Sequence, residues 1–171
     1  YRDVVITESD LSICNNIQNQ NVKDSCYSNI ADKNQNVSFC DSIQNQDIKD
    51  LCYWRIGLAI NDMAICDNIK GGDIKDDCFI RLIRSRSLSE QNMSICFKIQ
   101  NIDRKDFCLV QINSLKLNIT ICEIILGQDY KDQCYSNVAI NKNDTSICER
   151  IQNNIIKANC KYILEKNISI N

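Results

Sequence analysis

Twelve cysteines are the residues of this chain whose type and spacing could carry chemistry. Consecutive cysteines form pairs with a constant separation of 12 residues, and successive pairs are 14 residues apart except for one separation of 18. Thiols in such numbers form disulfides, hold metal ions or iron–sulfur clusters, or exchange electrons. The cysteines are Cys14, Cys26, Cys40, Cys52, Cys66, Cys78, Cys96, Cys108, Cys122, Cys134, Cys148 and Cys160.

The spacing argues against metal, cofactor and redox chemistry. Metal ligand sets and thiol oxidoreductases bring cysteines together at short spacing, such as C-x-x-C, whereas no two cysteines here are closer than 12 residues. The 171 residues include no histidine, which excludes histidine-based catalysis, and only 4 glycines, which leaves no glycine-rich phosphate loop. No paired acids and no nucleophile beside a base stand out. We therefore expect no cofactor, no metal and no enzymatic activity.

Disulfide bonds remain, with two possible pairings. The cysteines 12 residues apart can pair, or each pair can be shifted so that a bridge spans the longer link; the shifted pattern leaves Cys14 and Cys160 unpaired. A covalent closure fixes the spacing that it closes, so the constant 12 favours Cys14–Cys26, Cys40–Cys52, Cys66–Cys78, Cys96–Cys108, Cys122–Cys134 and Cys148–Cys160. In the chain-entropy model, each such bridge would add about 3 kcal/mol to the free energy of unfolding. The alternative, reduced cysteines acting as small buried hydrophobes, does not explain their regular register.

Disulfides at this density indicate an oxidising compartment, so the sequence predicts an extracellular or cell-surface protein. No apolar run is long enough to span a membrane. The formal net charge of −2 without a strong basic block argues against a nucleic-acid partner. The chain begins at Tyr1 without a signal peptide, which we interpret as a processed form or a piece of something longer.

The elements that position the cysteines repeat every 26 residues. Taking the first cysteine of each repeat as position 0, apolar residues recur at −1, +3 and +16, which predicts two helices per repeat. Only Asn or Gly stands at +5, so we expect the first helix to end there in a left-handed conformation. Asp or Asn at +7, followed in five repeats by Asp at +10, predicts the capped start of the second helix. Each repeat is therefore predicted to contain a short helix of about two turns, a connecting turn, and a second helix of about three turns.

Six such hairpins cannot fold singly, and their stacking predicts an all-α solenoid of disulfide-stapled hairpins. Residues 1–9 form an apolar N-terminal arm, and residues 10–171 form a single domain of six repeats. We place the repeats at about 10–35, 36–61, 62–91, 92–117, 118–143 and 144–171. Four extra residues after the third repeat predict a longer second helix over 79–89. Its basic cluster, Arg81, Arg84 and Arg86, is the candidate for a lateral contact.

Two further patterns have both a functional and a structural interpretation. Five N-x-[S/T] sequons predict glycosylation at Asn36, Asn92, Asn118, Asn143 and Asn167, although helix capping alone would also place Asn at most of these sites. Lys stands at position +9 of all six repeats, which predicts a Lys–Asp ladder along the stack or, alternatively, an anion-binding ridge.

The recurring text S-I-C-x-x-I and K-D-x-C-Y, as in Ser12-Ile13-Cys14 and Lys23-Asp24-Ser25-Cys26-Tyr27, resembles the cysteine-paired helical repeats of proteins predicted to be secreted in archaea. The resemblance covers residues 10 to about 166 and implies an extracellular disulfide-bonded solenoid without supplying an activity. We expect a structural subunit of a cell-surface filament, sheath or surface layer; the alternative is a solenoid that binds a surface protein or a glycan. Because repeat 6 resembles an inner repeat, we also expect head-to-tail self-association.

Overall fold

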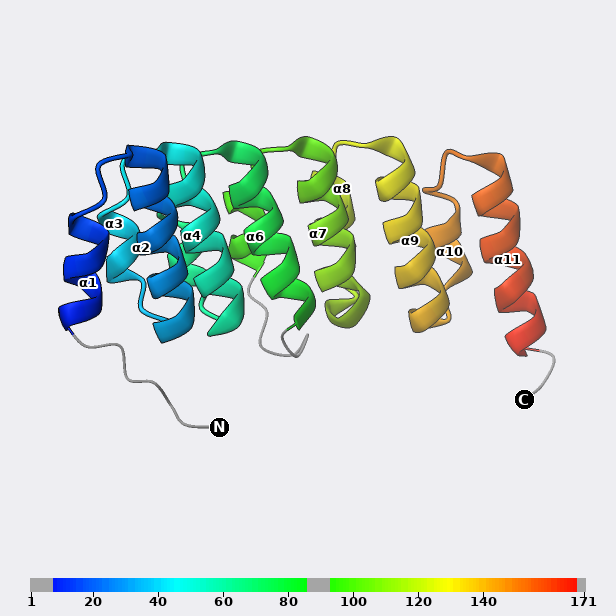
Figure 1. Cartoon of the computed structure of the whole chain (residues 1–171). Helices are drawn as coiled ribbons and strands as arrows, with labels where there is room; N and C mark the ends of the chain where they lie inside the picture. Colours follow the sequence, from blue (N-terminus) through cyan, green and yellow to red (C-terminus); the bar gives the residue numbers. More distant parts are fainter. Residues whose placement is uncertain (1–7, 86–92, 169–171) are drawn as a thin grey trace. The chain divides into compact units, whose positions relative to one another are not determined.

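The computed structural model of the chain describes residues 8–85 and 93–168, and within these ranges all regular secondary structure is helical (Figure 1). The predicted N-terminal arm lies almost wholly outside the described residues. The chain divides between Ser85 and Arg86 into two compact bodies, each of which holds three of the repeats. The all-α helical-repeat fold is thus confirmed, while a single six-repeat domain stays a prediction.

The N-terminal body contains three hairpins, numbered 1 to 3 after their repeats. Their first helices are short and their second helices are long, and the second helices α2, α4 and α6 lie side by side (Figure 1). Each short helix packs on the long helix of its own hairpin. The helices are α1 (Glu8–Asn15), α2 (Gln20–Asn34), α3 (Ser38–Asp41), α4 (Gln46–Ala59), α5 (Met63–Cys66) and α6 (Gly72–Ser85).

The C-terminal body contains hairpins 4 to 6 on the same plan. The long helix α9 packs against both α7 and α11, and the short helices lie beside the long ones. The first short helix is a 3₁₀-helix rather than an α-helix. The elements are η2 (Met93–Lys98), α7 (Ile102–Lys116), α8 (Ile119–Ile124), α9 (Gln128–Lys142), α10 (Thr145–Cys148) and α11 (Asn154–Ile168).

The predicted length of about two turns holds for the first helix α1, which has 8 residues, but it is wrong for three other first helices, and the second helices are longer than predicted. Three of the first helices, α3, α5 and α10, have 4 residues, about one turn, and the second helices have 14 or 15, about four turns. A 3₁₀-type bond closes the short helix early, because the backbone N–H at position +3 donates to the carbonyl of the first cysteine, as Ile43 does to Cys40 (3.2 Å).

The prediction of a left-handed helix end at position +5 is also wrong. Asn45 has a φ of −70° and is the N-cap of α4, where its side chain accepts a hydrogen bond from the backbone N–H of Ile48 (3.1 Å). Gly127 has the same φ and precedes α9 in the same way. The left-handed residues lie instead at the turn between hairpins, five positions before the first cysteine: Gln35, Asn61, Leu117 and Asn143.

The core of each body lies between the short and the long helices. The apolar positions +3 and +16 are almost fully buried in hairpins 2 to 6, as the helical spacing predicts. These residues are Ile43, Ile69, Ile99, Ile125 and Ile151 at +3, with Ile56, Leu82, Ile112, Val138 and Leu164 at +16. The disulfide sulfurs join this core, so each hairpin is held by both covalent and apolar contacts.

Candidate functional site: staples, clasps and a surface hollow

Each hairpin is closed by its own disulfide. All six bonds join cysteines 12 residues apart, with Cα–Cα distances of 5.5 to 6.0 Å, and no cysteine is free. This confirms the pairing that the constant spacing favours. Among the described residues no group of three or more His, Cys, Asp or Glu side chains is arranged to hold a metal ion. The sulfur chemistry seen here is therefore that of structural bridges.

A polar contact beside the bridge fastens the same two helices in several hairpins. The hydroxyl of Tyr53, at position +13, donates to the Asp41 carboxylate at position +1. Burial, and then this hydrogen bond, raise the pKa of the Tyr53 hydroxyl far above its usual value. In hairpin 6 an ion pair takes the place of the tyrosine contact, with Lys161 Nζ 2.5 Å from Glu149 Oε1. The residue type changes, but both pairs cross-link the short helix to the long one.

The lysines at position +9 cap the short helix. Lys75 Nζ donates to the backbone carbonyl of Asp67 (3.0 Å), and Lys23 and Lys157 make the same contact with the residues at +1 of their own hairpins. A cation at the C-terminal end of a helix satisfies exposed carbonyls and opposes the negative end of the helix dipole. For these three lysines the bond thus lies within a hairpin, rather than along the predicted Lys–Asp ladder.

A buried aspartate at position +10 joins one hairpin to the next, and we call this contact the aspartate clasp. The Asp24 carboxylate of hairpin 1 accepts hydrogen bonds from the backbone N–H groups of Gln44 (3.0 Å) and Asn45 (2.8 Å) in hairpin 2. The same pair of bonds runs from Asp50 to Lys70–Gly71, from Asp106 to Leu126–Gly127 and from Asp132 to Gln152–Asn153. Sequence reasoning gave this aspartate a role in its own helix and missed the clasp.

The clasp at Asp24 favours the charged form of its carboxylate. Burial pushes the pKa of Asp24 upward, but the backbone N–H groups of Gln44 and Asn45, the side-chain amide of Gln20 and the nearby Lys49 together bring that pKa below its usual value. The amide of Gln20 donates to Asp24 Oδ1 at 2.8 Å, and Gln46 and Gln128 support Asp50 and Asp132 in the same way. A charged acceptor with this many donors makes a strong contact between hairpins.

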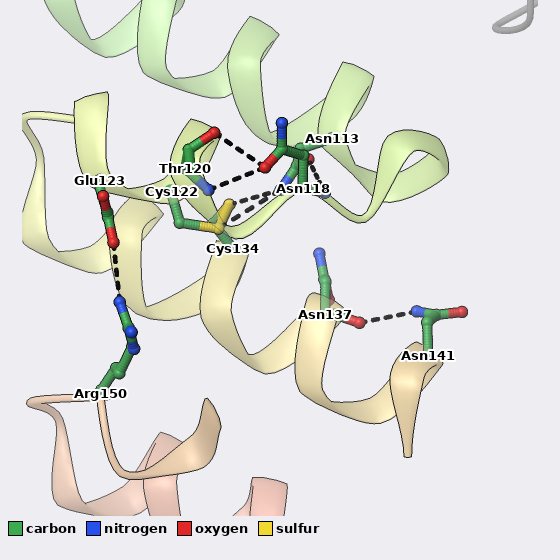
Figure 2. Close-up of a disulfide and its surroundings, with 9 residues drawn as sticks. All are labelled: Asn113, Asn118, Thr120, Cys122, Glu123, Cys134, Asn137, Asn141 and Arg150. Atoms are coloured by element: carbon green, nitrogen blue, oxygen red, sulfur yellow. Dashed lines mark hydrogen bonds and ion pairs between the residues drawn. A yellow bond between two sulfur atoms is a disulfide. The ribbon is translucent and has the colours of Figure 1, made fainter. Parts of the chain in front are cut away.

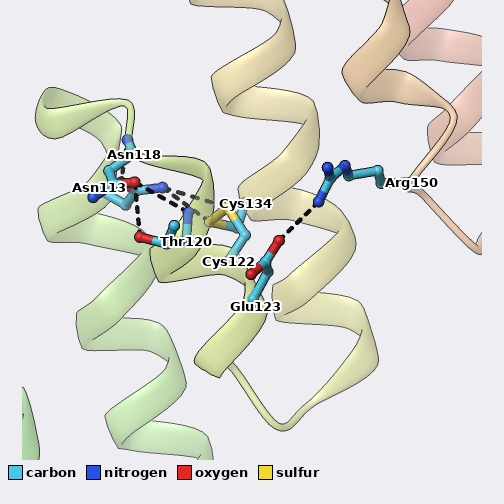
Figure 3. Close-up of polar contacts among 7 residues, drawn as sticks. All are labelled: Asn113, Asn118, Thr120, Cys122, Glu123, Cys134 and Arg150. Carbon is cyan, nitrogen blue, oxygen red and sulfur yellow. Dashed lines mark hydrogen bonds and ion pairs between the residues drawn. A yellow bond between two sulfur atoms is a disulfide. The ribbon is translucent and has the colours of Figure 1, made fainter.

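Hairpins 4 and 5 share an additional contact at a disulfide. The buried side chain of Asn113, on α7, directs Nδ2 toward Cys134 Sγ (3.1 Å) and Cys122 Sγ (3.4 Å), as Figure 2 shows. Its Oδ1 accepts the backbone N–H of Asn118 (2.9 Å), so the side chain also closes the turn after α7 (Figure 3). At the same position, +17, hairpins 1, 2 and 5 have Ala31, Gly57 and Ala139.

The basic cluster is part of a surface hollow on the N-terminal body. Asp77 Oδ2 accepts both the indole N–H of Trp54 (2.9 Å) and Nε of Arg81 (2.7 Å), while the Arg81 guanidinium lies 5.4 Å from the centre of the indole ring. The hollow has a volume of about 500 Å³ and is lined by Leu58, Asp77, Ile80, Arg81, Leu82 and Arg84. Arg86, the third arginine of the predicted contact, lies outside the described residues.

Three of the predicted glycosylation sites lie on exposed turns. Asn118 is the N-cap of α8, and Asn36 lies two residues before α3. In each the side-chain oxygen accepts both the backbone N–H and the hydroxyl of the sequon Ser38 or Thr120. Asn143 is exposed in the left-handed turn after α9. The side chains of Asn92 and Asn167 lie outside the described part of the chain. The capping role that competes with glycosylation is therefore present at Asn36 and Asn118.

The last hairpin departs from the inner ones on the side that would meet a further hairpin. Position +10 is Ala158 instead of Asp, and position +17 is Glu165, both exposed. Repeat 6 resembles an inner repeat in its disulfide and its buried core, but without an aspartate at +10 it has no side chain that could form a clasp with a further hairpin.

Fold and site together define a disulfide-stapled helical-repeat protein whose hairpins are joined by buried aspartates. No family model, curated protein or solved structure matches the chain. No helix in the described ranges is long and apolar enough to cross a membrane.

Proposed function

We propose that the chain is a non-enzymatic structural protein outside the cell, a subunit of a surface filament, sheath or surface layer. The observation that supports this most directly is the combination of one disulfide within each hairpin and an aspartate clasp between neighbouring hairpins. A clasp joins hairpins 1 to 2, 2 to 3, 4 to 5 and 5 to 6. Disulfides of this kind fit an oxidising compartment.

This arrangement suits a protein that must keep its form under load or in the presence of proteases. A disulfide across each hairpin prevents the 12-residue segment from being drawn out, even when the helices lose their packing. The aspartate clasps make the turn of one hairpin depend on the hairpin before it, which opposes local opening. The first device acts through sulfur and the second through a carboxylate and backbone N–H groups, and neither requires a ligand.

Electron microscopy of the surface of cells that make this chain tests the proposal. With gold-labelled antibodies against the chain, we expect label along ordered fibres or sheets, and shear fractions of these should contain the chain. Intact mass with and without reduction should differ by about 12 Da, two hydrogens for each of six bridges. Finding the chain only as a dispersed monomer, with no labelled assembly, would contradict a structural role.

Glycosylation of the exposed sequons belongs to the same proposal. The caps at Asn36 and Asn118 use the side-chain oxygen, whereas an N-linked glycan is attached through Nδ2, so the two roles are compatible. Aspartate makes the same cap in the chain, because Asp144 Oδ1 accepts the backbone N–H of Ser146 (2.9 Å). Asn36→Asp and Asn118→Asp should therefore remove glycan mass while leaving the unfolding midpoint unchanged. An unaltered mass would contradict glycosylation at these two sites.

The hollow beside Arg81 favours binding of a partner as the second candidate function. Two arginines beside apolar residues suit an acidic glycan, with Trp54, the one tryptophan of the chain, next to them. A uronic-acid oligosaccharide should change Trp54 fluorescence, whereas a neutral oligosaccharide of equal length should not. Arg81→Gln should abolish the change and Arg55→Gln, an exposed arginine of α4 that does not line the hollow, should retain it. An equal response to both sugars would contradict this function.

A further inference from the structure

Hairpin 1 carries an exposed face that hairpins 3, 5 and 6 bury. The residue at position −1 is 6% exposed in Ile65, 4% in Ile121 and 7% in Ile147, but 61% in Ile13. In hairpin 3 the preceding hairpin lies against this position: a Cβ atom added to Gly57 of hairpin 2 would lie 3.5 Å from Cβ of Ile65. Ile13 is thus the apolar part of an interface that the described residues leave uncovered.

The same face contains an unused pair of hydrogen-bond donors. In hairpins 2, 3, 5 and 6 the backbone N–H groups at positions +4 and +5 bind an aspartate of the preceding hairpin. The corresponding groups in hairpin 1 belong to Gln18 and Asn19, and no acceptor for them is found among the described residues. We call Ile13 with these two N–H groups the open face.

The chain itself shows which surface fits such a face. A long helix supplies Asp at +10 for the donor pair and, seven residues later, a small residue at +17 against which the apolar side chain packs. Hairpins 1, 2 and 5 combine these features as Asp24 with Ala31, Asp50 with Gly57, and Asp132 with Ala139. The complementary surface is therefore one face of a helix with the pattern D-x₆-[A/G], whose two defined residues lie about two helical turns apart.

The C-terminal hairpin of a second copy lacks this surface. Ala158 offers no acceptor, so the N–H groups of Gln18 and Asn19 would be buried without partners, which is unfavourable. Glu165 would bring a charged side chain to Ile13, where hairpins 1, 2 and 5 have a methyl group or a hydrogen atom at +17. Both substitutions therefore oppose head-to-tail pairing of identical copies.

We propose that the open face binds a different protein, one that presents a D-x₆-[A/G] helix from a hairpin of this kind. The aspartate of that partner forms a further clasp of the same geometry with Gln18 and Asn19, and its small residue covers Ile13. This inference holds whether or not the resulting complex is part of a surface layer.

Two substitutions turn the chain itself into a probe of this chemistry. The variant Ala158→Asp with Glu165→Ala recreates the surface of hairpins 1 and 5, and Ile13→Lys in the same molecule blocks its own open face. Mixed with the unmodified chain in analytical ultracentrifugation, this triple variant should form a one-to-one complex. The unmodified chain alone, and the chain mixed with Ile13→Lys alone, should remain monomeric at the same concentration.

Matched controls separate the clasp from nonspecific association. Replacing the new aspartate by Ala158→Asn in the triple variant should weaken the complex at least about tenfold, the loss of roughly one charged hydrogen bond. Using Ile13→Lys as the receptor should abolish the complex. Circular dichroism and intact mass confirm that every variant is helical and fully bridged. The proposal is overturned if the correctly folded probe does not bind, if the asparagine version binds equally well, or if the unmodified chain forms head-to-tail chains.

Discussion

The Asp132 carboxylate accepts the backbone N–H of Asn153, 21 residues further along the chain, at 2.8 Å. The contact uses only the backbone of the second residue and so does not itself require a particular side chain there. Gly71 and Gly127 occupy the same position in other hairpins and receive the same bond. The two backbone hydrogen bonds of each clasp therefore have one side chain as their acceptor, an aspartate.

Replacing this carboxylate should destabilise the C-terminal body. In Asp132→Asn the amide nitrogen would face the N–H of Gln152 or of Asn153, which leaves a buried donor without an acceptor. We expect a loss of about 1–3 kcal/mol in the free energy of unfolding, measured by urea denaturation. Asp129→Asn, an exposed change on the same helix, is the control and should shift stability by less than about 0.5 kcal/mol. Equal effects of the two changes would show that the clasp does not contribute measurably to the free energy of unfolding.

The clasp at Asp24 should make stability depend on acidic pH. The folded-state pKa of Asp24 is lowered from its ordinary value of 3.8. Its stabilisation is therefore fully present above that ordinary value and is lost as the pH falls through the lowered folded-state pKa. Urea midpoints should decline as the pH decreases below about 4. The decline should be smaller in Asp24→Asn, and an identical pH profile for the two proteins would contradict this origin.

Asn113 should tolerate loss of its side chain better than gain of a charge. Asn113→Ala reproduces the residue of hairpins 1 and 5 and leaves no new charge, so we expect a loss of about 1–2 kcal/mol from the hydrogen bonds to Asn118 and the sulfurs. Asn113→Asp would bury a carboxylate against two sulfur atoms that cannot donate to it. It should cost clearly more, about 3 kcal/mol or above. Thermal unfolding of the two variants checks this order, and the reverse order would contradict the described contact.

Removing one disulfide should make its own hairpin open more readily while the neighbouring hairpins remain helical. The double variant Cys122→Ala and Cys134→Ala opens a loop of 12-residue span, and we expect a loss of about 3 kcal/mol in unfolding free energy. Hydrogen exchange should rise first in α8 and α9 and last in the hairpins of the N-terminal body. Uniform exchange throughout both bodies would show that the hairpins are less autonomous than the local bridges indicate.

Much of the fold could be predicted because six copies repeat the same information. Apolar spacing predicted two helices per repeat, and the constant 12-residue separation predicted the correct disulfides. The prediction failed where one residue type is compatible with two local structures. Asn or Gly at +5 suits a left-handed helix end and also an N-cap, and in the structure Asn45 serves as the N-cap. Propensity alone does not separate these two uses.

The site was harder to predict because its contacts lie between repeats. Asp at +10 fits a role in its own helix, and only the packing of hairpins shows that Asp24 binds the turn of the next one. A signal was present in the sequence, since the sole repeat without this aspartate is the last, where Ala158 stands. The hollow could not be predicted as a whole, because Trp54 and Arg81 lie 27 residues apart and in different repeats.

The local character of the bridges bears on how the molecule is made. Each cysteine finds its partner 12 residues away, so a chain that emerges gradually into an oxidising space exposes a correct pair before the following one arrives. Mispairing, the usual hazard for a polypeptide with many thiols, is thereby avoided by timing. Biosynthesis can then proceed hairpin by hairpin, with every completed segment already locked while the remainder is still being delivered.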